Sequence, residues 1–127
     1  MTRPTYRIEG ATFETLEGFY DEVERQMLGG QPFGRNLDAF NDILRGQFGP
    51  LPDAFGLVWA DAAVSRERLG YAETVRQLRL RLQRCHPSDR GAVREELAAA
   101  ERGEGPTVFD WLLEIICHHP NVEFRLA

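Results

Sequence analysis

The chain has 127 residues, of which 43% are hydrophobic and 28% are charged, and its formal net charge is −5. This length and apolar content predict one domain, residues 1–127, with a single core. The negative charge disfavours nucleic acid as a partner, because phosphate contacts require a basic surface. No apolar run approaches the roughly 20 residues that cross a bilayer, and the N-terminus shows no secretory signal. We therefore expect a cytoplasmic protein that makes no membrane contact.

The N-terminal part of the chain is expected to form a strand and then a helix. Residues 5–10 alternate apolar and polar side chains, which predicts a strand that ends at Gly10. Thr12 is expected to cap the following helix, and Gly29-Gly30 to end it. Apolar side chains recur along this helix at steps of three or four residues, at Phe13, Leu16, Phe19, Tyr20, Val23 and Met27.

The C-terminal part is expected to combine two strands with three helices. The apolar run at 55–60 is typical of a strand buried on both faces, and residues 122–126 alternate as a final strand. One helix is expected over 71–85, and several residues before Tyr71 could also be helical. A second helix is expected after a cap at Ser88 or Asp89, and a third after a cap at Thr107. The last helix should face the core with Val108, Trp111, Leu112, Ile115 and Ile116. The order β-α-α-β-α-α-α-β predicts an α/β fold, because strands separated by helices pair in parallel.

A short acidic helix is the most informative segment of the chain. Asn36 is a good N-cap, and Gly46 stops the helix. Asp38 and Asp42 are four residues apart and share the outer face. The opposite face carries an apolar stripe made of Leu37, Phe40, Ile43 and Leu44. A capped, rigid element with two outward carboxylates is suited to docking against a cationic surface.

This segment also resembles a known family. Its pattern is Gly34-x-Asn36-Leu37-Asp38-Ala39-x-x-Asp42-x-Leu44-x-Gly46, which is similar to the central helix of the barstar-type ribonuclease inhibitors. The resemblance covers roughly the first half of the chain and its last twenty or so residues. It implies a small three-stranded parallel sheet packed with helices, with a helical insertion at about 65–105 before the last helix and strand. It also implies an intracellular inhibitor that is not an enzyme and that needs no cofactor or metal.

The resemblance assigns roles to individual residues. Asp42 would enter the phosphate site of the nuclease, and Asp38 would meet a second basic group or backbone amides. The partner-binding set implied in this way is Phe33, Gly34, Asn36, Asp38, Asn41, Asp42, Arg45 and Gly46. The partner would be an extracellular-type or toxin ribonuclease with a basic active site, and the inhibitor would be a monomer.

Three departures from the family pattern lie in this segment. Pro32 replaces an aromatic residue, although the aromatic Phe33 is retained next to it. Asn41 stands where a tryptophan is common. Arg35 and Arg45 place positive charge beside the acids. These changes remove aromatic contact area, which is often a source of binding energy.

Other interpretations of the sequence remain open. The acids could form an ordinary solvated helix face, with Asp42 paired to Arg45. Alternatively, the scaffold could serve as an interaction module without a nuclease partner, with the helical insertion as its binding surface. Four arginines in the insertion could contact nucleic acid or an acidic partner, but nearby Glu95, Glu96 and Glu101 favour an intramolecular or solvated charge face. The four are Arg76, Arg79, Arg81 and Arg84.

Metal binding and catalysis are disfavoured by the same sequence. Cys85-His86 and Cys117-His118-His119 could supply zinc ligands, but their spacing matches no familiar zinc module. Two cysteines in a chain of this length make no disulfide framework, so we expect buried free thiols and surface histidines. The paired acids lie on one exposed helix with no nucleophile motif or phosphate loop beside them.

Overall fold

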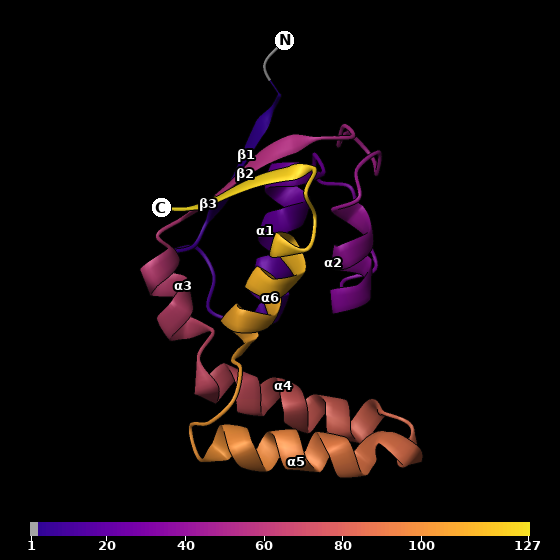
Figure 1. The fold of residues 1–127 in the computed structure, drawn as a ribbon, viewed down its shortest axis with the longest axis vertical. Helices are drawn as coiled ribbons and strands as arrows, with labels where there is room; N and C mark the ends of the chain where they lie inside the picture. The colour runs from indigo at the N-terminus through magenta and orange to yellow at the C-terminus, as the bar shows by residue number, and fades with distance from the viewer. Residues whose placement is uncertain (1–2) are drawn as a thin grey trace.

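The computed structural model describes residues 3–127, and it forms a two-layer α/β fold (Figure 1). The sheet contains β1 (Thr5–Glu9), β2 (Phe55–Ala60) and β3 (Val122–Leu126). The helices are α1 (Leu16–Met27), α2 (Leu37–Ile43), α3 (Ala62–Arg68), α4 (Tyr71–Arg84), α5 (Arg90–Glu101) and α6 (Val108–Cys117), with a short 3-10 turn at Pro87–Asp89. The predicted α/β class and the three parallel strands are confirmed.

The sheet has the order β1-β2-β3, and both pairings are parallel. Ile8 lies opposite Trp59 in the first pairing, and Leu57 lies opposite Phe124 in the second. Five of the six residues of the central strand β2 are buried, and Val58 is partly exposed. This explains its continuous apolar sequence, because a parallel strand with neighbours on both sides has little contact with water.

The helices lie on one face of the sheet. Figure 1 shows α1 and α6 beneath the sheet, α2 beside them, and the pair α4–α5 extending away from the sheet at the far end of the molecule. The core between the layers is aromatic. Phe19 stacks on Trp59 with ring centroids 5.2 Å apart, and Phe109 meets Trp59 edge-on at 5.1 Å. Trp59 is fully buried, so this cluster joins α1, β2 and α6 into one core.

The region predicted as an insertion forms a helical hairpin. It contains the end of α3, all of α4, the 3-10 turn and α5. Leu78 of α4 and Val93 and Ala100 of α5 are its buried apolar residues in these two helices, and most of its other side chains are polar. Arg81 lies over the Trp111 ring at 5.1 Å, which joins the hairpin to α6. Within residues 3–127, no helix is both long and apolar enough to cross a membrane.

Several local predictions need correction. Thr15, not Thr12, caps α1, and its hydroxyl accepts from the Gly18 N–H at 3.0 Å. Thr12 instead bonds the Glu9 carbonyl and closes a turn after β1. A separate helix α3 precedes α4, and Asp89 stands at the start of α5 without a side-chain cap. In α6, Trp111 and Ile115 are only partly buried, whereas Phe109 is fully buried.

Candidate functional site

The two acids predicted on α2 point into solvent. Asp38 and Asp42 are both exposed, and the Asp42 side chain is 65% accessible. The expected pairing is present, because Arg45 Nη1 lies 3.7 Å from Asp42 Oδ1, with 69% of the Arg45 side chain exposed. An ion pair this exposed contributes little, so Asp42 stays available to a stronger cation. Among residues 3–127, no ion pair engages Asp38.

The start of α2 is fixed by its cap and by its apolar stripe. Asn36 Oδ1 accepts from the Ala39 N–H at 2.7 Å, which confirms the predicted cap. The Asn36 amide also donates to the Gly34 carbonyl at 3.3 Å, and both residues are exposed. Three residues of the predicted stripe are fully buried, namely Phe40, Ile43 and Leu44, and Leu37 is partly buried. Burial of this face therefore sets the rotation of α2 and directs the acids outward.

The loop before α2 is held against α1. The Phe33 ring packs edge-on against Tyr20, with centroids 5.6 Å apart, and its N–H donates to the Glu24 carboxylate at 3.3 Å. Arg35 donates to Glu24 at 3.0 Å and to Asp21 at 2.8 Å. The expectation that Arg35 adds charge beside the acids is wrong, because its guanidinium turns back to α1. The hydrogen bond to Asp21 is the largest influence that raises the pKa of Arg35, so this charge stays with α1.

The end of α2 is tied to the sheet. Gly46 has φ of +92°, and an added Cβ there would lie 2.7 Å from the Pro52 carbonyl oxygen. Only glycine fits both the left-handed backbone and this close approach. Asn121 donates from Nδ2 to the Leu44 and Asp53 carbonyl oxygens, each at 2.9 Å. The last turn of α2 is therefore bonded to the residue that precedes β3.

Asn41 has a partner inside the protein. Its Oδ1 lies 2.7 Å from His119 Nε2, and since an amide oxygen can only accept, the ring nitrogen donates. Burial, followed by the charges of Arg45 and His118, lowers the pKa of His119. His119 is thus held as a neutral donor against α2, and Asn41 is only partly exposed.

The sequence of this scaffold matches a described family. Residues 3–108 match the family model described as Barstar (barnase inhibitor). The chain belongs to the barstar family. Members of this family act as inhibitors, and their partner in general is a ribonuclease. No curated protein matches the chain.

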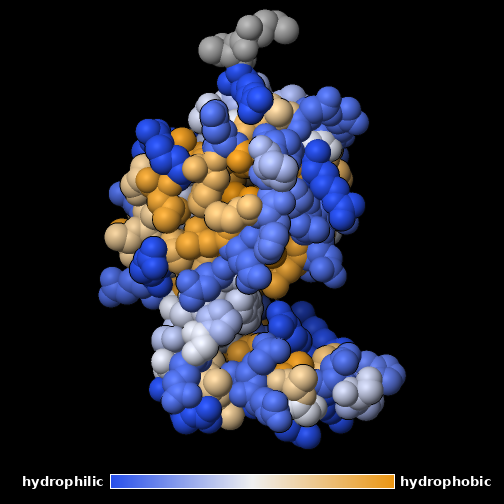
Figure 2. Space-filling view, viewed as in Figure 1, coloured by the Kyte–Doolittle hydropathy of each residue, from blue (hydrophilic) through white to orange (hydrophobic). Residues whose placement is uncertain are grey.

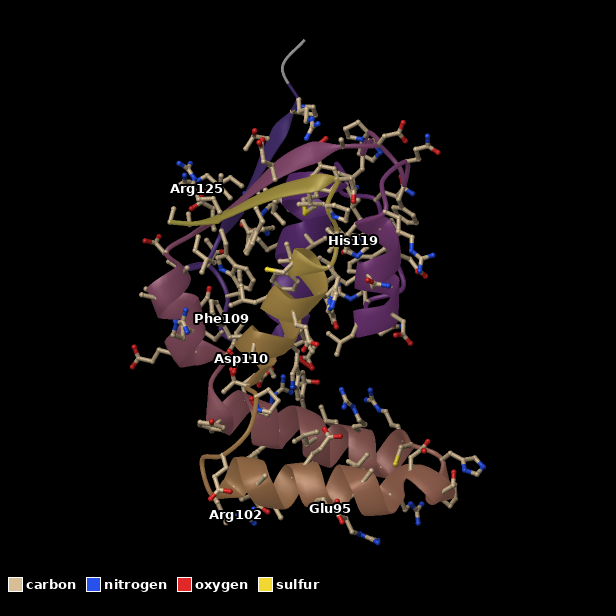
Figure 3. The ribbon with its side chains drawn as sticks, viewed as in Figure 1. Glu95, Arg102, Phe109, Asp110, His119 and Arg125 are labelled. Atoms are coloured by element: carbon tan, nitrogen blue, oxygen red, sulfur yellow. The ribbon has the colours of Figure 1, made fainter. Side chains whose placement is uncertain are left out.

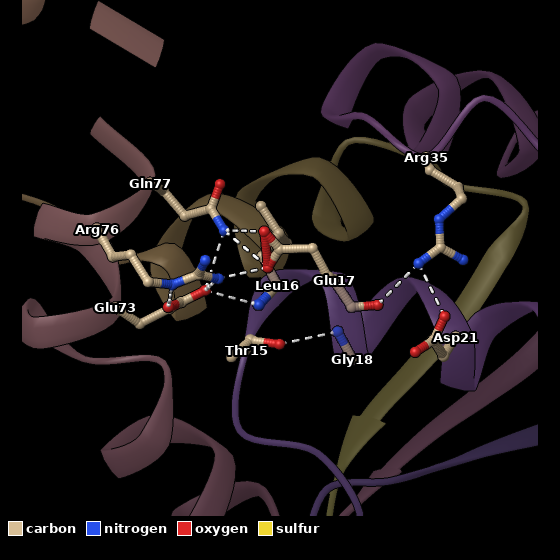
Figure 4. A network of polar contacts seen from close by, with 9 residues as sticks. All are labelled: Thr15, Leu16, Glu17, Gly18, Asp21, Arg35, Glu73, Arg76 and Gln77. Atoms are coloured by element: carbon tan, nitrogen blue, oxygen red, sulfur yellow. Dashed lines mark hydrogen bonds and ion pairs between the residues drawn. The ribbon is translucent and has the colours of Figure 1, made fainter. Parts of the chain in front are cut away.

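In this barstar-family chain, α1 also anchors the hairpin. The carboxylate of Glu73 in α4 accepts from the Leu16 N–H at 2.8 Å and from Arg76 at 2.6 Å (Figure 4). Arg76 also pairs with Glu17 on α1, and Gln77 donates to Glu17 at 3.1 Å. Burial alone would raise the pKa of Glu17, but the hydrogen bonds, the one from Arg76 foremost, lower it. The loop before α2 and the hairpin are therefore positioned by the same helix.

A groove lies between the hairpin and the start of α2. Its volume is about 400 Å³, and it is bordered by α1, by residues 35–37 and by α4. The apolar lining residues are Leu16, Tyr20, Leu37 and Leu80, and the basic ones are Arg35, Arg81 and Arg84. The groove therefore adjoins the N-terminal end of α2.

The remaining predicted clusters are separated by the fold. Cys85 is partly buried and Cys117 is exposed, so the expectation of buried thiols is wrong. In the described part of the chain, no three His, Cys, Asp or Glu side chains converge as a metal site requires. The intramolecular ion pairs expected of the four arginines are present for three of them. Arg76 pairs with Glu17 and Glu73, Arg79 with Glu101 at 3.2 Å, and Arg81 with Glu96 at 3.8 Å.

Three residues that support the site could not be recognised from local sequence patterns. Glu24 receives both the Phe33 N–H and Arg35, and His119 and Asn121 hold α2 from the far end of the chain. Glu24 is one of several charged residues on α1, and nothing in the sequence distinguishes it from the others. Asn121 carried no local signal either, because the carbonyl oxygens that it bonds belong to Leu44 and Asp53, 77 and 68 positions away in sequence.

Proposed function

We propose that this protein inhibits a ribonuclease by covering the enzyme's active site with the acidic face of α2 and with residues 33–36. The observation that carries the proposal is the exposure of Asp38 and Asp42 on a helix that is fixed at both ends. Among the residues described, neither acid is engaged by a strong internal cation. A basic nuclease cleft built for RNA phosphates would accept these two carboxylates in their place.

The fixed geometry favours tight binding. The Asn36 cap, the Arg35 contacts with α1 and the Asn121 contacts at the other end order the segment before any partner arrives. Little conformational entropy is then lost on association. The acidic protein and a basic nuclease would also attract each other at a distance, so association should be fast and should slow as salt is added.

The proposed contact set divides into two groups. Asp38 and Asp42 supply charge, while Gly34, Asn36 and Gly46 present backbone or amide groups beside them. Phe33 is committed to Tyr20, and Asn41 is committed to His119, so each offers the partner only an exposed edge. Arg45 would release Asp42 on binding and contact the rim of the nuclease.

The proposal is tested by measuring inhibition and affinity with a purified barnase-type ribonuclease. Asp42→Ala should raise the dissociation constant at least about 30-fold, as expected for an interface hot spot of about 2 kcal/mol. The barnase–barstar complex is itself a known example of such hot spots, so this magnitude is carried over from the family rather than derived from this structure. Glu95→Ala is the matched control, because Glu95 is an exposed acid on α5 (Figure 3).

The outcome also distinguishes the alternative function. If Asp42→Ala and Asp38→Ala bind the nuclease as tightly as the unmodified protein, the acidic face is not the interface. The groove next to α4 favours a second candidate, an interaction module that uses the hairpin. In that case Arg84→Glu would abolish capture of the partner, whereas Asp42→Ala would leave it intact.

A further inference from the structure

The strand β3 has one open edge. Within residues 3–127, β3 pairs only with β2. The Asn121 carbonyl accepts from the Phe55 N–H at 3.2 Å, and the Ala127 N–H donates to the Trp59 carbonyl at 2.8 Å, so the odd-numbered residues bond β2. Successive residues of a strand direct their backbone groups to opposite sides. The N–H and C=O groups of Phe124 and Leu126 therefore face the open edge, where a further strand could pair.

The side chains of β3 are arranged symmetrically about Phe124. The strand reads Val-Glu-Phe-Arg-Leu, so an acid stands directly before the central aromatic residue and a base directly after it. Glu123 and Arg125 are exposed on the sheet face that the helices leave uncovered. Val122, Phe124 and Leu126 lie on the other face, opposite Phe55, Leu57 and Trp59 of β2.

We propose that two copies of this chain associate by antiparallel pairing of their β3 strands, about a two-fold axis at Phe124. This pairing places each Glu123 opposite Arg125 of the second copy and each Val122 opposite Leu126. Phe124 pairs with itself through the backbone groups that face the open edge. Both Glu–Arg pairs then fall at non-hydrogen-bonded positions, where the Cα atoms are about 4.5 Å apart and side chains are closest. The product is a continuous six-stranded sheet with an isologous interface. This proposed dimer differs from the monomer expected from the sequence.

The other edge of the sheet does not offer this complementarity. The Gly10 N–H donates to the Ala60 carbonyl, and the Pro4 carbonyl accepts from the Gly56 N–H, so the even-numbered residues face β2. A two-fold axis through the middle of β1 would therefore fall at Arg7 and set two arginines opposite each other. The outward Glu9 N–H is already bonded to the buried Glu22 carboxylate at 2.7 Å. The Val122 N–H at the start of β3 is likewise bonded, to the His119 carbonyl at 3.1 Å, so it is charge complementarity that selects β3 for self-association.

Apolar surface beside β3 supports the same partner. Leu126 is 39% exposed, and Leu113 of α6 and Phe124 are partly exposed. Figure 2 shows hydrophobic atoms gathered on the face of the molecule where β3 and α6 lie in Figure 1. A second copy paired along β3 would cover part of this surface, and apolar burial would add to the backbone hydrogen bonds.

The test is sedimentation velocity on the full chain over a wide concentration series, under reducing conditions because Cys117 is exposed. We expect a reversible dimer. Glu123→Arg and Arg125→Glu each turn both interchain pairs into like-charge pairs, and each should raise the dimer dissociation constant about tenfold or more. The double variant Glu123→Arg/Arg125→Glu restores opposite charges and should dimerise like the unmodified chain. An equimolar mixture of the two single variants should also dimerise, because every acid then faces a base.

The same measurements include a control variant and results that would contradict the proposed dimer. Arg7→Glu makes the charge change of Arg125→Glu on the other edge, and it should leave dimerisation unchanged. Circular dichroism checks that each variant is folded, as expected for exposed side chains. A chain that stays monomeric at every concentration overturns the proposal, and so does assembly beyond the dimer. It is equally overturned if the single variants dimerise normally, or if the folded double variant fails to recover. The acidic face of α2 is unaltered in all these variants, so the result is independent of nuclease inhibition.

Discussion

Glu73 in α4 caps the first turn of α1 from 57 residues further along the chain, because its carboxylate accepts the Leu16 N–H at 2.8 Å. The first amides of a helix have no partner within the helix, and Leu16 is the first residue of α1. The Glu73 side chain is only 5% exposed and is also bonded to Arg76. The hairpin therefore stabilises the helix on which the loop before α2 rests.

Replacement of Glu73 by alanine should lower the free energy of unfolding by about 1.5–3 kcal/mol, the usual loss for a buried hydrogen bond to a charged group. The substitution leaves the Leu16 N–H without an acceptor and Arg76 with one carboxylate instead of two. Urea denaturation measures the change. Glu73→Gln should recover part of the loss, because its amide oxygen can still accept from Leu16.

The control for this prediction is Glu101→Ala, which removes an exposed partner of Arg79. That change should stay within about 0.5 kcal/mol, as is usual for surface ion pairs. Equal effects of the two alanine variants would show that the Glu73 contact with α1 contributes nothing special.

Asn36→Ala should destabilise the protein by about 1 kcal/mol, because the Ala39 N–H loses its side-chain acceptor. Asn36→Asp keeps an acceptor at the helix start, where negative charge is favourable, and should be close to neutral. Thermal unfolding by calorimetry ranks the two variants. A loss as large for aspartate as for alanine would contradict a capping role.

Gly46→Ala should be strongly destabilising, by more than about 1 kcal/mol, because φ is positive and the added Cβ would clash with the Pro52 carbonyl oxygen. Gly103→Ala separates these causes, since Gly103 also has positive φ, 71°, but has no atom within 4 Å of the added Cβ. Chemical denaturation of both variants should show a larger loss at Gly46. Similar losses at the two positions would show that the contact with the Pro52 carbonyl oxygen does not contribute to the destabilisation.

The folded protein should lose stability as the pH falls below the ordinary histidine pKa of 6.5, because the fold lowers the pKa of His119. The unfolded chain then binds a proton that the folded chain resists, so the free energy of unfolding falls until the pH passes the folded value. The stabilising effect is fully present above 6.5, where His119 is neutral in both states. Denaturation at a series of pH values should show this slope.

His119→Asn should flatten that slope, since it removes the titrating ring while leaving a group that can donate towards Asn41. His86→Asn is the control, because His86 is exposed and its hydrogen-bond partner Ser88 is local. An unchanged pH profile in the His119 variant would assign the dependence to other groups.

Part of the site was predictable because its causes are local. The Asn36 cap acts three residues away, and the stripe that contains Phe40 and Ile43 follows the helical period. With that stripe buried, the same period turns Asp38 and Asp42 to solvent. The alternating and apolar runs located all three strands for the same reason.

Other features depend on contacts that no local pattern encodes. Thr12 and Thr15 are both plausible caps, and the path of the chain after β1 selects Thr15. No local pattern predicts the direction of the Arg35 side chain, because it is set by two carboxylates of α1 that hold the guanidinium away from α2. The residues that hold α2 from the C-terminal part lie 77 and 78 positions away in sequence.

The sequence by itself determined the three strands, the capped acidic helix and the side on which its carboxylates lie, because period and capping act over a few residues. Only the tertiary structure decided which groups hold that helix in place, how the hairpin is attached to α1, and that β3 is left with an open edge. Those outcomes depend on contacts between polar groups that are far apart in sequence. Such groups come together only when the whole chain has packed and its apolar faces are buried.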